Sequence, residues 1–117
     1  MSFKKDQYIV IKKALPKILI DFLYHYFQNK RRAAHIMLNT KFLSPYDITW
    51  GYWNDPQSPN TYSHYGDVAF DTVLEGVKDK IEKAVGYSLI PTYSYARIYK
   101  QGDILKRHTD RYSCEIS

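Results

Sequence analysis

The C-terminal residues 93–117 constrain the fold most strongly, because they combine a strand pattern, a turn and two potential metal ligands. Side chains of a strand alternate between its two faces, so every second residue from 93 to 99 is expected to share one face. The residues of that face are Tyr93, Tyr95, Arg97 and Tyr99. Gly102 and Asp103 then predict a turn, and the alternation that resumes at Cys114 predicts the opening of a further strand.

His108 and Asp110 lie two positions apart between these two predicted strands. In an extended segment both side chains point to the same side, so they can converge on one metal ion. Imidazole and carboxylate are the ligands of the 2-His-1-carboxylate triad, which binds Fe(II) and leaves positions open. The alternative is a surface pair beside the basic side chains of Lys106, Arg107 and Arg111.

The N-terminal third predicts a short strand followed by a long helix. Residues 7–13 are rich in aromatic and β-branched side chains, which favours a strand. Pro16 suits the first turn of a helix, which is expected to run to about Leu38, with a break near residues 29–31 left open. The apolar residues at helical spacing are Leu19, Phe22, Leu23, Tyr26, Phe27, Ala34 and Met37.

Residues 39–65 show no sustained period and are interrupted by proline, glycine and asparagine, which predicts a long loop. Five of its aromatic residues are Trp50, Tyr52, Trp53, Tyr62 and Tyr65. They are expected to pin the loop onto the helices, and a ligand platform is the alternative. A second helix is expected from Asp67, a good N-cap, to Gly86. Gly76 inside it suggests close packing against a neighbour.

The chain of 117 residues is long enough for one domain with its own core, so a single domain over residues 1–117 is expected. Its 17 Lys and Arg against 12 Asp and Glu give a net charge of +5, scattered rather than clustered. The single cysteine, Cys114, and the absence of any long apolar run favour a cytoplasmic protein that does not span a membrane. Nucleic-acid binding has no motif to support it.

Tyr99, Gly102, His108 and Asp110 stand in the order and spacing Y-x-x-G-x-x-x-x-x-H-x-D, after an aromatic strand. This pattern resembles the 2-oxoglutarate- and Fe(II)-dependent oxygenases, specifically the prolyl 4-hydroxylase-like group. The order of the N-terminal elements is also similar to that group, although only the C-terminal motif is specific.

The resemblance implies an α+β fold, with N-terminal helices packed on the first strands of a double-stranded β-helix (jelly-roll) core that is incomplete in this chain. It implies that His108 and Asp110 bind Fe(II) and that Tyr99 hydrogen-bonds 2-oxoglutarate. The implied activity is a dioxygenase that hydroxylates a prolyl or similar residue in a peptide or protein, an oxidoreductase reaction for which ascorbate is a further candidate cofactor.

The family that this motif resembles also uses a distal histidine and a basic residue that binds 2-oxoglutarate, and both would follow Ser117. We therefore expect this chain to be the N-terminal part of an oxygenase and to be inactive alone. The three upstream histidines, His25, His35 and His64, are expected to be structural or solvated. Two other interpretations stay open: a basic binding module for nucleic acid or an acidic protein, and a chain that self-associates through an exposed sheet edge.

Overall fold

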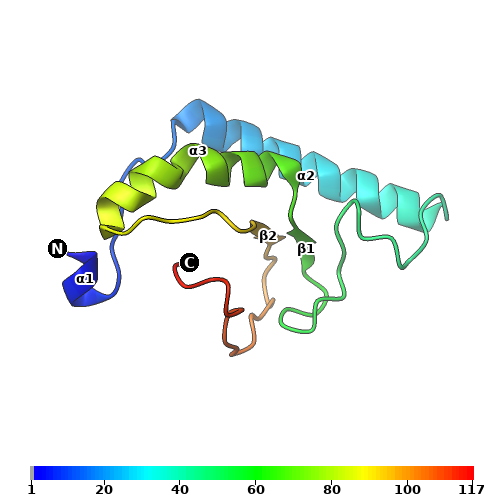
Figure 1. The fold of residues 1–117 in the computed structure, drawn as a ribbon. Helices are drawn as coiled ribbons and strands as arrows, with labels where there is room; N and C mark the ends of the chain where they lie inside the picture. The colour runs from blue at the N-terminus through cyan, green and yellow to red at the C-terminus, as the bar shows by residue number, and fades with distance from the viewer. Residues whose placement is uncertain (1) are drawn as a thin grey trace.

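The computed structural model describes residues 2–117, in which two long helices lie on one side of a small sheet (Figure 1). The elements in chain order are α1 (Phe3–Asp6), α2 (Lys17–Asn39), β1 (Tyr62–Tyr65), α3 (Val68–Val85) and β2 (Tyr95–Ile98). The expected α+β class is confirmed. Among the described residues, the sheet has two antiparallel strands. No helix within residues 2–117 combines the length and the apolar character needed to cross a membrane.

Helix α2 begins after Pro16 and continues without interruption through residues 29–31. Pro16 is its N-cap, a position where the missing N–H of proline costs no hydrogen bond. One stripe of the helix is buried, formed by Leu23, Phe27 and Ala34. The predicted helix is therefore confirmed, although Phe22 of its predicted apolar stripe is exposed, and the break that was left open does not occur.

Helix α3 begins and ends where its caps predict. The Asp67 side chain accepts hydrogen bonds from the N–H groups of Ala69 (2.9 Å) and Phe70 (3.2 Å), which satisfies the first turn. Gly86 ends the helix in a left-handed conformation with φ +80°. The prediction of close packing at Gly76 is wrong, because a Cβ built there would meet no atom within 4 Å.

The sheet joins the end of the long loop to the strand that carries the tyrosine face. Ser63 pairs with Arg97, and Tyr65 pairs with Tyr95. Ser63 also forms an isolated bridge with Tyr52 on its other side. The loop is therefore tied to one edge of β1, and β2 pairs with the other edge. The outer edge of β2 has no partner strand among residues 2–117.

Two strands expected from the local sequence, one from composition and one from alternation, are not formed. Residues 7–13 are extended or turn, and left-handed conformations at Gln7 (φ 65°) and Lys13 (φ 53°) interrupt both ends of the segment. Near the C-terminus, the N–H of Cys114 donates to the carbonyl oxygen of Arg111 (2.8 Å), so this segment turns instead of extending. In both places the residue pattern suits a strand, but no neighbouring strand is present to pair with it.

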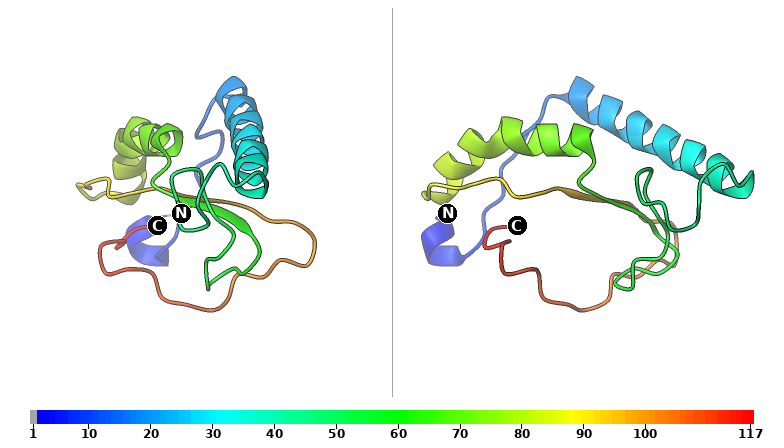
Figure 2. Two further views of the ribbon diagram at one scale, coloured as in Figure 1. Left: turned by 90° about the vertical axis from the view of Figure 1, so that its right-hand side faces the viewer. Right: turned by 45° about the vertical axis from the view of Figure 1, so that its right-hand side comes forward.

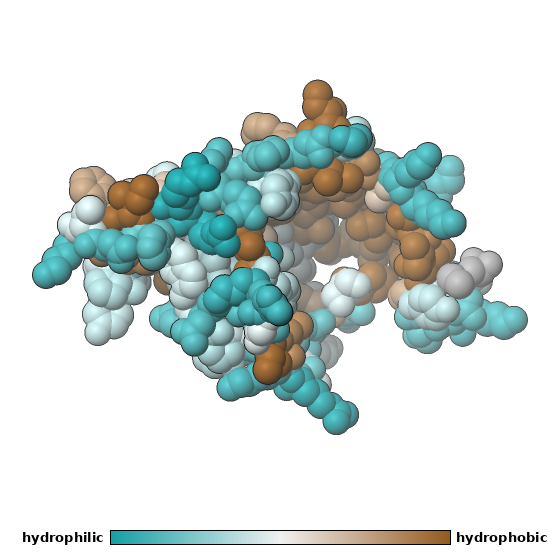
Figure 3. Space-filling view, turned by 180° about the vertical axis from the view of Figure 1, so that it is seen from behind, coloured by the Kyte–Doolittle hydropathy of each residue, from teal (hydrophilic) through white to brown (hydrophobic). Residues whose placement is uncertain are grey.

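The apolar core sits where α2, the start of α3 and the sheet meet (Figure 2). Phe27 contacts Tyr62 and Phe70, with ring centroids 5.0 and 5.2 Å apart, and Trp53 contacts Tyr62 at 4.9 Å. Trp53 and Tyr62 therefore pin the loop to the helices, as expected. Many other apolar side chains stay at the surface, as the face opposite that of Figure 1 shows (Figure 3).

Candidate functional site

Three residues of the C-terminal motif, Tyr99, His108 and Asp110, line one pocket of about 740 Å³, whereas Gly102 does not. The whole predicted face of the C-terminal strand lines it, from Tyr93 to Tyr99, and so do residues 108–111. Tyr52 and Tyr65 line it from the loop and from β1. The alternation of residues 93–99 therefore predicted correctly which side chains share a face. Tyr52 and Tyr65 were expected to pack on the helices, and they line the pocket instead.

His108 and Asp110 face each other on the rim of this pocket. The distance from His108 Nε2 to Asp110 Oδ1 is 3.4 Å. Two atoms bound at right angles to one ion, each at about 2.1 Å, lie about 3.0 Å apart, so a small shift would allow both to bind the same ion. The expectation that the pair converges agrees with this geometry.

The hydrogen bond made by His108 Nδ1 decides which ring nitrogen is available to a metal. Nδ1 lies 2.7 Å from the carbonyl oxygen of Lys106. A carbonyl oxygen can only accept, so Nδ1 is the donor in this contact, and Nε2 is the ring nitrogen that faces Asp110. Histidines that bind metals usually donate the opposite N–H in this way, which fixes the orientation of the ring.

The pair alone does not complete a metal centre. Within residues 2–117, no group of three or more His, Cys, Asp or Glu side chains is placed to hold an ion. The side chain of His108 is 26% exposed and that of Asp110 is 51% exposed, so the rim is open to further ligands. The donor atoms present fit two positions of a facial triad, and the third ligand is missing from this set.

Asp55 fixes one wall of the pocket and was not predicted from the sequence. Its carboxylate binds the Arg97 guanidinium (2.6 Å) and accepts a short hydrogen bond from the Tyr95 hydroxyl, which also contacts the Tyr52 hydroxyl (2.9 Å). Burial disfavours the charged form of Asp55, but the bonds from Tyr95, the Gln57 N–H and Arg97 prevail and lower its pKa. Arg97 therefore pairs with Asp55, and no local signal in the sequence indicates this partner.

The same loop holds the segment that carries His108. Asp55 Oδ1 accepts from the N–H of Gln57 (2.9 Å), and the carbonyl oxygen of Gln57 accepts from the N–H of Lys106 (2.7 Å). Lys106 in turn presents its own carbonyl to His108 Nδ1. Arg97, Asp55, Gln57 and Lys106 therefore form a continuous set of contacts from β2 to the candidate ligand.

Arg111 occupies another wall of the pocket. Its guanidinium carbon lies 5.4 Å from the ring centroids of both Tyr65 and Tyr93, and these two rings are themselves 4.7 Å apart. Cys114 anchors this wall, because its Sγ–H donates to the Tyr93 hydroxyl at 3.0 Å. Cys114 is partly buried, and it closes a turn from Arg111 instead of opening the expected strand.

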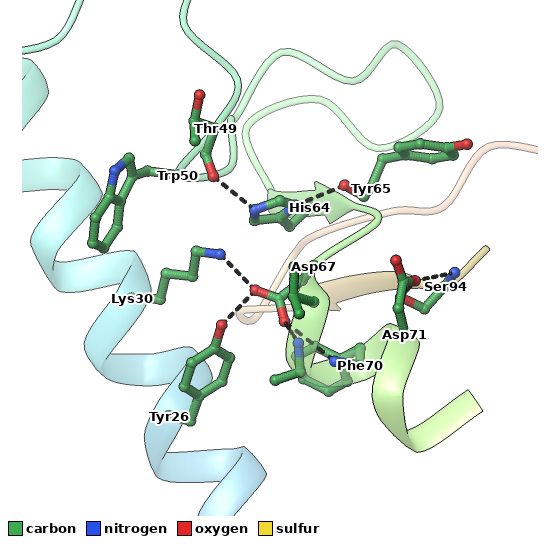
Figure 4. Close-up of polar contacts among 12 residues, drawn as sticks. Tyr26, Lys30, Thr49, Trp50, His64, Tyr65, Asp67, Phe70, Asp71 and Ser94 are labelled. Atoms are coloured by element: carbon green, nitrogen blue, oxygen red, sulfur yellow. Dashed lines mark hydrogen bonds and ion pairs between the residues drawn. The ribbon is translucent and has the colours of Figure 1, made fainter. Parts of the chain in front are cut away.

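A second polar cluster, centred on Asp67, joins the two long helices away from the pocket (Figure 4). Asp67 accepts from the Tyr26 hydroxyl (2.6 Å) and pairs with Lys30 Nζ (2.5 Å), both on α2. Burial opposes the charge on Asp67, but the bonds from Lys30 and Tyr26 outweigh it and lower the pKa of this carboxyl. The pKa of Tyr26 is raised by burial and by the neighbouring carboxylate. The cluster is a structural connection between α2 and α3.

The three upstream histidines lie outside the pocket. His64 is buried, and its two ring nitrogens lie 2.9 Å from the carbonyl oxygen of Tyr65 and 3.0 Å from that of Thr49 (Figure 4). His25 is exposed on α2, and His35 contacts Asn39 at 3.0 Å. The structural or solvated roles expected for these residues agree with their positions.

Comparisons with protein-family models, with curated proteins and with solved structures found no match.

Proposed function

We propose that this chain is the N-terminal part of an Fe(II)- and 2-oxoglutarate-dependent dioxygenase that hydroxylates a prolyl or similar residue in a peptide or protein. The observation that carries the proposal is the 3.4 Å approach of His108 Nε2 to Asp110 Oδ1, on the rim of a pocket that Tyr99 also lines. An imidazole nitrogen beside a carboxylate oxygen is a ligand pair that suits a ferrous ion.

Each residue has a distinct role in this proposal. His108 and Asp110 hold two positions of the metal, and the carbonyl of Lys106 keeps the His108 ring in its binding orientation. The Tyr99 hydroxyl donates a hydrogen bond to a carboxylate of 2-oxoglutarate. Bound Fe(II) would supply the activation of O2 that couples decarboxylation of 2-oxoglutarate to hydroxylation. The aromatic walls of the pocket bind the substrate and reduce the access of water.

The proposal places two missing components downstream of Ser117, in the jelly-roll strands that would complete the core: the third metal ligand and the basic residue for the far carboxylate of 2-oxoglutarate. Two ligands hold an ion less tightly than three. We therefore expect residues 1–117 alone to bind metal weakly and not to turn over.

The proposal is tested by titrating the chain with Mn(II) and following free Mn(II) by electron paramagnetic resonance. We expect weak one-to-one binding that His108→Ala and Asp110→Ala each reduce by at least about tenfold. His25→Ala is the matched control, because His25 is exposed on α2 and lies outside the pocket. Binding that is unchanged in His108→Ala, or reduced equally by His25→Ala, would contradict the proposal.

A further inference from the structure

Arg111 is the charged group of the pocket that no carboxylate neutralises. Asp55 pairs with Arg97 at 2.6 Å, and Asp110 faces His108 at 3.4 Å. Arg111 makes no ion pair with any side chain among residues 2–117, although it lines the same pocket as both carboxylates. The pocket therefore presents one guanidinium whose positive charge is available to a ligand.

The structure also holds this guanidinium in place. It lies 5.4 Å from the ring centroids of both Tyr65 and Tyr93, within the range of cation–π attraction. Contact with two rings restricts the long side chain before any ligand arrives, which lowers the entropy cost of binding. The N–H donors of a guanidinium match the two oxygens of a carboxylate.

We infer that Arg111 binds an anionic group of the ligand that enters this pocket, and that this group is the carboxylate of an acidic side chain in a peptide. A pocket of about 740 Å³ with several tyrosine walls is large enough to take more than an isolated carboxylate. The net charge of +5 favours encounter with an acidic partner. That the ligand is a peptide rests on the proposed function, whereas the anion site rests on Arg111 itself.

Two peptides that differ by one charge test this inference: acetyl-Glu-Pro-Gly-amide and acetyl-Gln-Pro-Gly-amide. Their dissociation constants are measured by NMR titration of the full 117-residue chain without metal, at low salt. We expect the Glu peptide to bind about tenfold more tightly, because a charged hydrogen bond contributes about 1.5 kcal/mol or more. Arg111→Gln should remove this preference, and Arg111→Lys should keep part of it.

Arg107→Gln is the matched control, since it removes the same charge from an exposed residue outside the pocket and should keep the preference. Equal affinities in the wild type, no saturable binding of the Glu peptide, or a preference that survives Arg111→Gln would overturn the inference. Loss of the preference in Arg107→Gln would also overturn it, because the attraction would then be unspecific.

Two further binding measurements distinguish this inference from the proposed function. If Arg111→Gln weakens binding of 2-oxoglutarate but not of the Glu peptide, the anion belongs to the cosubstrate and the peptide assignment is overturned. His108→Ala should weaken Mn(II) binding by at least about tenfold while leaving the peptide preference intact. An unchanged Mn(II) affinity in that variant would contradict the proposed function alone.

Discussion

At the scale of single residues, Asp55 holds a wall of the candidate pocket in place, although it is not one of the candidate metal ligands. Its carboxylate and the Arg97 guanidinium are both largely buried, with side chains 12% and 11% exposed. Removing one partner of a buried pair leaves the other charge without compensation. The contacts that run from Asp55 through Gln57 to Lys106 carry this effect towards His108.

We predict that Asp55→Asn lowers the free energy of unfolding by about 3 kcal/mol, because Arg97 is left buried without a carboxylate. The measurement is urea denaturation followed by circular dichroism. Asp79→Asn is the control, because the Asp79 side chain is 98% exposed and a surface pair contributes at most about 1 kcal/mol. Equal stability of Asp55→Asn and wild type would show that this pair does not support the pocket.

At the scale of elements, α2 and α3 are joined by Asp67, which predicts an acid-sensitive connection. The pKa of Asp67 is lowered in the folded chain, although burial alone would raise it. The stability that it contributes is therefore fully present above its unfolded pKa of about 3.9 and is lost as pH falls through the lower folded pKa.

We predict that Asp67→Asn lowers the free energy of unfolding by about 3 kcal/mol at pH 7, since Lys30 loses its buried partner while asparagine can still cap α3. The difference from wild type should shrink as pH falls below about 4. Asp21→Asn, at an exposed pair with Lys17, is the control and should stay within about 0.5 kcal/mol of wild type. A difference that is constant from pH 7 to pH 2 would refute the role of the charge.

Two glycines provide a matched pair of predictions for the loop and for α3. A Cβ at Gly51 would lie 2.5 Å from the Tyr62 side chain, and its φ of +92° disfavours any side chain. Gly51→Ala should lower the free energy of unfolding by at least about 2 kcal/mol. Gly76→Ala should raise it by about 1 kcal/mol, because the site is open and alanine favours a helix. Thermal denaturation compares the two, and the same sign for both would contradict the structure.

The sequence predicted those elements whose signals are local. Asp67 and Gly86 mark both ends of α3, and the apolar period predicts α2, because caps and helical hydrogen bonds join near neighbours. A strand depends on a partner elsewhere in the chain. Residues 7–13 have the composition of a strand but no partner, so local composition was misleading there.

The same difference between local and long-range contacts explains what the sequence predicted of the candidate site. His108 and Asp110 are two residues apart, so their convergence could be predicted from spacing. Asp55 and Arg97 are 42 residues apart, and their contact depends on the path of the loop, which has no periodic pattern. Arg111 was noted only as a basic neighbour of the motif, because its position against Tyr65 and Tyr93 exists only in the folded chain.

At the scale of the whole molecule, the chain exposes more surface than a compact monomer of its mass. Its accessible surface is 9167 Å², against about 6,700 Å² for a typical folded monomer of 13.9 kDa. Its radius of gyration is 16.2 Å, against about 13 Å for a compact domain of this length. Exposed apolar residues such as Ile18, Phe42 and Ile90 contribute to this surface.

We predict that the isolated chain self-associates through the outer edge of β2, which has no partner strand among the described residues. Light scattering coupled to size-exclusion chromatography should give a mass that rises with concentration above 13.9 kDa. Tyr95→Pro should reduce the association, because the β1–β2 register points the N–H of Tyr95 to the outer edge and proline removes that donor. A constant monomer mass over the whole concentration range would contradict this prediction.

The central claim is that His108 and Asp110 hold the same metal ion, and paramagnetic NMR tests it most directly. Mn(II) added to the 15N-labelled chain broadens the amide signals of residues near the ion. The account predicts broadening centred on residues 108–110 and extending to Tyr99, and lost in His108→Ala. Broadening centred on His25 or His35, or broadening that persists in His108→Ala, would contradict it.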